Sequence, residues 1–151
     1  MQGSGMRFLV STFLLLIACP LLEAKDELPW AFNGIRAEGY SIDLVTVDPA
    51  PGTPLIAASE VEFKITVTYA MSVAKKGKIL LVFQDEKNRS AKPDGPMLSQ
   101  DVTEPTGSVS LVEKITIPKR AKELRLFVPL VPEGINETNG EVTIRYPVNK
   151  K

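Results

Sequence analysis

The chain has no histidine and only one cysteine, Cys19, among its 151 residues. Histidine is the commonest general base and metal ligand, so its absence removes the side chain that most often serves catalysis or metal binding. Cys19 lies in an apolar N-terminal run, which leaves the rest of the chain without a disulfide, a thiolate nucleophile or a sulfur ligand for zinc. Motifs of nucleophilic serine enzymes and phosphate-binding glycine loops are also missing. We therefore expect a protein that is not an enzyme and that uses no cofactor or metal.

An excess of charge is missing too, because 18 Lys and Arg residues balance 18 Asp and Glu residues. Proteins that bind nucleic acids usually show a clear basic excess or a basic face. The composition therefore predicts no nucleic-acid partner. The length suits one domain with its own hydrophobic core.

The longest apolar run, FLVSTFLLLIACPLL at residues 8–22, follows a basic residue. This pattern is typical of a secretory signal peptide, and the run is too short for a convincing membrane span. Cleavage after Ala24 would give a signal peptide over residues 1–24 and a secreted or periplasmic protein. Alternatively, residues 16–19, Leu-Ile-Ala-Cys, resemble a bacterial lipobox, in which Cys19 would be lipidated and anchor the chain to a membrane. An uncleaved anchor is a third alternative.

Residues 60–71, EVEFKITVTYAM, carry the clearest strand pattern. The apolar side chains share one parity, and Glu, Lys and Thr residues occupy the other. Side chains alternate across a strand, so this run predicts one apolar face and one polar face. A single polar face favours an antiparallel sheet, because parallel sheets are usually covered on both sides.

Further runs rich in apolar and β-branched residues, each bounded by turn residues, predict the other strands. They cover residues 40–47, 79–85, 97–102, 108–118, 124–131 and 142–148. We therefore predict an all-β fold, a single antiparallel Ig-like β-sandwich of about seven strands over residues 39–149. Residues 25–38 show no period and contain Pro29 and Gly34, which predicts an irregular N-terminal leader.

Four irregularities within these runs predict local features. The apolar parity shifts at Val45, which indicates a bulge or a strand that changes sheets. Glu113 interrupts an apolar row, which indicates a bulge or an edge position. Pro129 indicates that one side of its strand is unpaired there. Residues 79–85 are apolar on both parities in their first half, which predicts a central strand whose outer face is partly shielded.

Several stretches resemble bacterial Ig-like or fibronectin-type-III-like extracellular domains. These are GKILLVF, GSVSLVEKITIPKRAKELRLFVPLVPEG and GEVTIRY, and PEGINETNGEVTI is similar to the end of CARDB domains. The resemblance covers most of residues 38–149 and lies in strand rhythm and apolar pattern. The chain departs from antibody-type domains, because it lacks their cysteine pair and has no tryptophan in the strand that begins at Ile79. The resemblance implies a sandwich with a spacing, adhesion or accessory binding role and no shared active site.

The connections at residues 72–78 and 132–140 should share one end of such a sandwich, where these folds usually bind partners. The binding hypothesis names six residues of these two loops: Lys75, Lys76, Lys78, Glu133, Asn136 and Glu137. The oxygen atoms of the second loop could also serve calcium, but their spacing matches no EF-hand pattern. A second basic cluster, at residues 119–122, should lie at the opposite end, so we interpret it as a solvated turn.

Trp30 and Phe32 form an aromatic pair near the N-terminus. They could provide a stacking platform for a sugar or a peptide, or they could cover the open end of the core. The leading hypothesis is a non-enzymatic exported module that mediates protein–protein interaction or acts as a structural domain in the periplasm or cell envelope. The alternative is a small carbohydrate-binding module that uses these exposed aromatic side chains.

Overall fold

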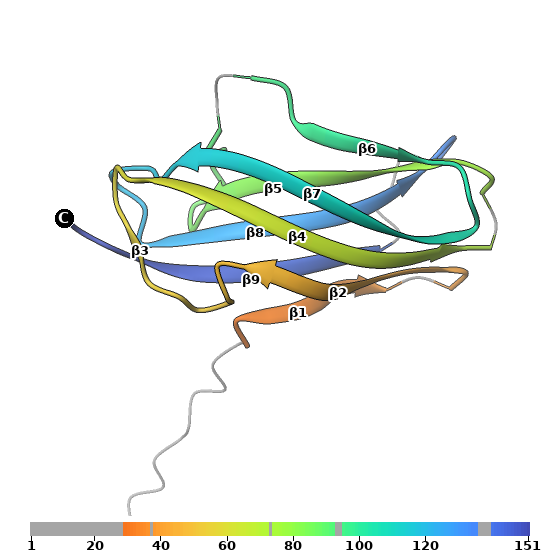
Figure 1. The fold of residues 1–151 in the computed structure, drawn as a ribbon, viewed down its shortest axis with the longest axis horizontal. Helices are drawn as coiled ribbons and strands as arrows, with labels where there is room; N and C mark the ends of the chain where they lie inside the picture. The colour runs from red at the N-terminus through yellow and green to blue at the C-terminus, as the bar shows by residue number, and fades with distance from the viewer. Residues whose placement is uncertain (1–28, 37, 73, 93–94, 136–139) are drawn as a thin grey trace, which may run out of the picture.

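Two sheets pack face to face in the computed structural model, which describes residues 29–36, 38–72, 74–92, 95–135 and 140–151 (Figure 1). The small sheet has the order β2-β4-β7, and the large sheet has the order β1-β9-β8-β5-β6. The strands are β1 Ala31–Arg36, β2 Tyr40–Asp48, β3 Leu55–Ile56, β4 Glu60–Met71, β5 Gly77–Asp85, β6 Leu98–Val102, β7 Thr106–Thr116, β8 Glu123–Pro132 and β9 Gly140–Asn149.

The pairing is antiparallel throughout both sheets, except that the short β3 runs parallel to the end of β9. This arrangement confirms the predicted all-β, Ig-like sandwich. Every regular element in the described ranges is a strand, and none of these ranges contains a helix that could cross a membrane.

Strand β4 has the predicted two faces and lies in the middle of the small sheet. Phe63, Ile65 and Val67 are buried to 1% exposure or less. Burying a side chain of this kind stabilises a fold by about 1.5–3 kcal/mol. On the opposite face, the hydroxyl groups of Thr66 and Ser110 form a hydrogen bond of 2.9 Å. The alternation of the sequence therefore fixes which side of β4 faces the core.

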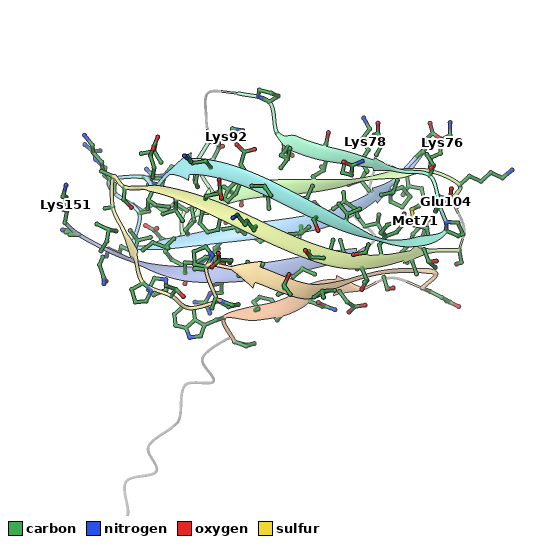
Figure 2. The ribbon with its side chains drawn as sticks, in the orientation of Figure 1. Met71, Lys76, Lys78, Lys92, Glu104 and Lys151 are labelled. Carbon is green, nitrogen blue, oxygen red and sulfur yellow. The ribbon has the colours of Figure 1, made fainter. Side chains whose placement is uncertain are left out.

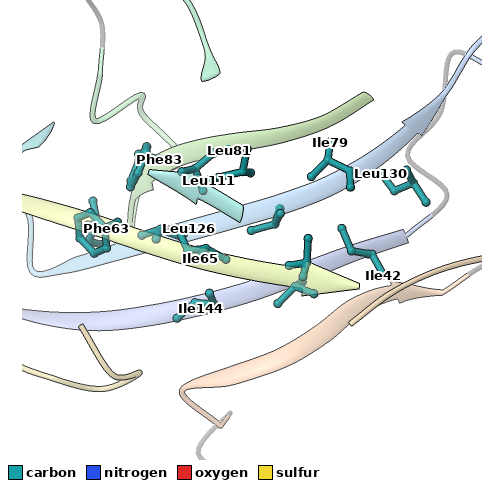
Figure 3. Close-up of a cluster of buried hydrophobic side chains, with 14 of the residues drawn as sticks. Ile42, Phe63, Ile65, Ile79, Leu81, Phe83, Leu111, Leu126, Leu130 and Ile144 are labelled. Atoms are coloured by element: carbon teal, nitrogen blue, oxygen red, sulfur yellow. The ribbon is translucent and has the colours of Figure 1, made fainter. Parts of the chain in front are cut away.

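The core fills the space between the sheets, and residues of both sheets contribute to it (Figure 3). The ring of Phe63 packs against Phe83 of β5 at a centroid distance of 5.3 Å and against Tyr146 of β9 at 5.4 Å. Tilted and edge-on aromatic pairs of this kind add to the stabilisation from burial. These three rings tie the centre of the small sheet to two strands of the large one.

Three of the local irregularities have structural counterparts. The register between β2 and β4 shifts between Leu44 and Thr46, which confirms a bulge at Val45. Pro129 pairs with β9, but the ladder between β8 and β5 has a gap at this position, as expected for a residue that has no N–H group. Glu113 lies on β7, an edge strand whose register with β4 is continuous, so the edge position is correct and the bulge is not.

The expectation of an irregular leader over residues 25–38 is wrong for Ala31–Arg36, which form strand β1 on the edge beside β9. The sequence hid this strand because a polar residue, Asn33, follows Ala31 on its inward side. Asn33 donates a hydrogen bond of 2.9 Å to Asp43 of β2, so no apolar alternation marks the strand. A register shift between Asn33 and Ile35 disturbs the period further. The predicted signal peptide, residues 1–24 with Cys19, lies outside the described residues.

Candidate functional site

The β4–β5 and β8–β9 connections lie at the same end of the sandwich, as the binding hypothesis requires. The backbone N–H of Glu133 donates a hydrogen bond of 2.8 Å to the carbonyl oxygen of Lys76. Lys76 and Lys78 lie at this end and Lys151 at the other (Figure 2). We call the end formed by Lys76–Lys78 and Val131–Glu133 the loop end.

A hollow of about 460 Å³ opens at the loop end. Its lining comprises Lys76, Gly77, Lys78, Asp101, Val102, Thr103, Val131, Pro132 and Glu133. Lys78 lies 3.8 Å from the carboxylate of Asp101, while the side chains of Lys76 and Glu133 are exposed. The hollow therefore combines apolar surface with exposed charges of both signs.

Gly77 allows the two connections to approach each other here. A Cβ atom at Gly77 would lie 3.0 Å from the carbonyl oxygen of Val131 and 3.0 Å from the sulfur of Met71. No ordinary side chain fits these distances without displacing backbone, so the close approach depends on the missing side chain. The shape of the hollow thus rests on this glycine.

The remaining residues of the binding hypothesis are Lys75, Asn136 and Glu137. Lys75 is exposed in the β4–β5 connection, and Asn136 and Glu137 lie outside the described residues. The second basic cluster is at the other end of the sandwich, where the carbonyl oxygen of Lys122 accepts a hydrogen bond of 2.9 Å from Val148 near the C-terminus. The two basic clusters therefore form separate surfaces.

Trp30 and Phe32 both lie beside β9 on the outward side of the large sheet. Trp30 is 38% exposed, and its ring centroid is 5.2 Å from the guanidinium of Arg145. A Cβ atom at Gly52 would lie 2.8 Å from the same ring, so the indole also packs on the backbone there. Phe32 is half-buried and pairs with Thr143.

Arg145 also belongs to a charge cluster on this face. Its Nη2 donates to Glu123 at 2.6 Å, and Nε of Arg125 donates to the other oxygen of the same carboxylate at 2.6 Å. Burial raises the pKa of Glu123, but the hydrogen bonds and charges of Arg145 and Arg125 outweigh this effect, so the pKa lies below its ordinary value. Two guanidinium groups and one carboxylate leave this cluster with a net charge of +1.

Sequence reasoning missed a broad apolar surface on the outward face of the large sheet. We call it the outer apolar strip, which comprises Leu80, Val82, Met97, Phe127, Pro129 and Val131. These six residues, with Gln84 and Glu141, line a shallow hollow of about 320 Å³. The clue in the sequence was present, because the runs that became β5 and β8 are apolar on both parities.

Among the described residues, Glu141 is the one carboxylate that lines this shallow hollow. Burial raises its pKa above the ordinary value, and a hydrogen bond of 3.3 Å from the hydroxyl of Thr143 lowers it by less. This side chain therefore places a partly desolvated negative charge beside apolar neighbours.

No cluster of three acidic, cysteine or histidine side chains that could hold a metal occurs within the part of the chain that the structure describes. No protein-family model matches the chain, and no curated protein matches it in sequence. Among solved structures, the chain is similar to the CARDB domain of a protein from Pyrococcus furiosus, solved in complex with di-metal ions. The TM-score is 0.44 and the identity 10%, over 76% of this chain and 93% of that domain.

The likeness concerns the fold alone, and the β-sandwich assignment stands on the strand order of the chain itself.

Proposed function

We propose that this protein is an exported, non-enzymatic β-sandwich module that binds another protein in the periplasm or cell envelope through its loop end. The observation that carries the proposal is the hollow of about 460 Å³ between the two connections. Loops at one end of a rigid sandwich can vary without disturbing the core, which is why such folds bind partners there.

The chemistry of the loop end fits a polypeptide partner. Val131 and Pro132 supply apolar surface within the hollow, and Lys76 and Glu133 supply exposed charges at its border. An apolar centre with a charged border is the usual composition of protein–protein interfaces. Among the described residues, the lining contains neither a serine nor a cysteine, and Thr103 is its one hydroxyl side chain.

The test uses the purified protein with an affinity tag, incubated with envelope extract and culture fluid of its own source. We expect the unmodified protein and Lys119→Glu to retain the same specific protein, and Lys76→Glu to lose it. Lys119 is an equally exposed lysine at the opposite end of the sandwich, so it controls for loss of positive charge alone. Identical captured proteins for all three would refute binding through the loop end.

A carbohydrate-binding function is the second candidate, because Trp30 keeps 38% of its surface exposed beside a guanidinium group. An indole ring and an arginine side by side can stack on a sugar and donate hydrogen bonds to its hydroxyl groups. Binding to immobilised polysaccharides that Trp30→Ala abolishes and Trp30→Tyr retains would favour this function. Binding that Lys76→Glu abolishes instead would favour the loop end.

A further inference from the structure

The outward faces of the two sheets differ in polarity. The small sheet presents Glu62, Lys64 and Thr66 from β4, with Ser110, Val112 and Lys114 from β7, so its one apolar residue here stands among polar neighbours. The large sheet carries the outer apolar strip, in which Met97 is exposed, Pro129 is buried and the other four residues are half-buried. A contiguous apolar patch of this kind usually marks an interaction surface. The strip is therefore the candidate contact surface of the sandwich.

The strip continues from β5 to β1 in a single row of cross-strand pairs. Val82 of β5 pairs with Phe127 of β8. Phe127 pairs in turn with Thr143 of β9, and Thr143 pairs with Phe32 of β1. Paired residues point to the same side of a sheet, so this outward row crosses four of the five strands and stops before β6.

The size of the surface suits the centre of an interface. Strands lie about 4.8 Å apart, and residues on one face recur about every 6.8 Å along a strand, so three rows across four strands span roughly 390 Å². A standard stable interface covers about 800 Å² on each partner, of which the apolar centre is only a part. The charged residues beside the strip, such as Arg125 and Glu141, would form the border.

The charges on this face complement each other under a two-fold rotation. Arg145 and Glu141 lie on β9 two residues to either side of Thr143. If two large sheets face each other and a two-fold axis runs along this row through Thr143, each Arg145 lies over Glu141 of the other copy, while it stays paired with Glu123 in a cluster of net charge +1. The same axis superposes the row of Val82 and Phe127 on itself. The chain has a formal net charge of zero, so two copies do not repel each other at long range.

We propose that two copies of this chain associate through the outer apolar strip, with their large sheets face to face around this two-fold axis. The strands of the two copies then run in opposite directions, so the two loop ends point away from each other. Such a dimer carries two binding ends on one rigid body and can bridge two partners. Val131 lines both the strip and the loop-end hollow, so the two surfaces meet at this residue.

Sedimentation velocity of the purified protein over a concentration series tests the proposal. We expect a reversible shift from the monomer mass to twice that mass. Met97→Glu and Leu80→Glu should each weaken the association by about tenfold or more, because a charge enters the apolar centre. Val112→Glu is the matched control on the small sheet, since Val112 is 53% exposed and Met97 51%. This control should leave the dissociation constant within about twofold of the original.

Glu141→Arg tests the orientation, because it would place two cations together across the axis. It should weaken the association more than Glu141→Gln does, while the thermal unfolding midpoint confirms that each variant is folded. A mass that stays monomeric at every concentration would overturn the proposal. So would a dimer that Met97→Glu and Val112→Glu affect equally. A photo-crosslinker at position 97 that captures a different protein, with the isolated chain monomeric, would assign the strip to that protein instead.

Discussion

Lys92 and Glu113 join the two sheets across one open edge of the sandwich. Nζ of Lys92, in the connection after β5, donates to the carboxylate of Glu113 on β7 at 2.8 Å. Both side chains are largely shielded, at 28% and 16% exposure. A charge that points inward from an edge strand discourages pairing with a foreign strand. Glu113, which interrupts the apolar row of β7, therefore protects this edge strand from pairing with another chain.

Lys92→Met should lower the free energy of unfolding by about 1–2 kcal/mol, because the shielded carboxylate of Glu113 loses its charged partner. Lys64→Met is the matched control, since Lys64 pairs with Glu62 at 3.1 Å while both side chains are exposed. The control should cost less than about 1 kcal/mol. Urea unfolding at neutral pH measures both values, and equal losses would show that shielding does not strengthen the Lys92 pair.

Much of the sandwich could be predicted because one physical signal, alternation across a strand, marks each strand that buries one face. The bounds of β4 follow directly from it. Alternation does not mark a strand that is held mainly by pairing with a neighbouring strand. Strand β1 is held by backbone bonds to β9 and has the polar Asn33 on its inner side, and β3 consists of only two residues. Neither strand could be recognised from its own residues.

Of the two candidate sites, the sequence predicted the loop end but not the outer apolar strip. The meeting of Lys76 and Glu133 followed from topology, because connections of alternate strands gather at one end of a sandwich. The outer apolar strip could not be assigned, because apolar residues on both parities are equally typical of a strand covered by other chain segments. Only the strand order shows that, among the described elements, none covers Val82 and Phe127 on the outward side.

The carboxylate of Asp85, at 3% exposure, organises the turn after β5. It accepts hydrogen bonds from the backbone N–H groups of Lys87 at 2.9 Å and Arg89 at 3.0 Å, and from Nε of Arg89 at 2.7 Å. Burial raises the pKa of Asp85, but these hydrogen bonds and the charge of Arg89 outweigh it, so the pKa lies below its ordinary value of 3.8.

Asp85 should therefore make stability depend on pH on the acid side. The native state has the lower pKa, so the contribution is fully present above the unfolded-state pKa of about 3.8 and is lost as the pH falls through the native-state pKa. Asp85→Asn should flatten this part of the profile of unfolding free energy, measured in urea from about pH 2 to about pH 7. Asp101→Asn, at a carboxylate that is 74% exposed, is the control for removing an acidic side chain. An unaltered slope in Asp85→Asn would contradict the assignment.

Gly77→Ala should lower the free energy of unfolding by about 1–3 kcal/mol, because the new methyl group meets backbone atoms that cannot move aside. Besides the carbonyl oxygen of Val131, the α-carbon of Pro132 would lie 3.3 Å from it. Gly134→Ala separates this effect from backbone strain, since Gly134 has a φ of 77° and no atom within 4 Å of an added Cβ. That control should cost about 1 kcal/mol. A larger loss of unfolding free energy in Gly134→Ala than in Gly77→Ala would show that the close approach of backbone atoms to position 77 is not the main cost.

Two buried tyrosines differ in whether the hydroxyl group has a partner. Tyr146 is fully buried, and its hydroxyl donates a hydrogen bond of 2.7 Å to the carbonyl oxygen of Pro49. Tyr40 is 7% exposed, and its hydroxyl has no hydrogen-bond partner among the described residues. An unpaired buried hydroxyl costs free energy, whereas a paired one contributes to stability. The same change of tyrosine to phenylalanine should therefore have different effects at the two positions.

Tyr146→Phe should lower the free energy of unfolding by about 1–2 kcal/mol, because it leaves the carbonyl oxygen of Pro49 without its donor. Tyr40→Phe should be neutral or raise the free energy by up to about 1 kcal/mol, because it removes a desolvated group that gains nothing in the folded state. Both variants keep the aromatic ring, so the packing of the core stays the same. Urea unfolding of the two variants and the unmodified protein measures the difference, and a loss at Tyr40 as large as that at Tyr146 would mean that the Tyr40 hydroxyl is paired in solution.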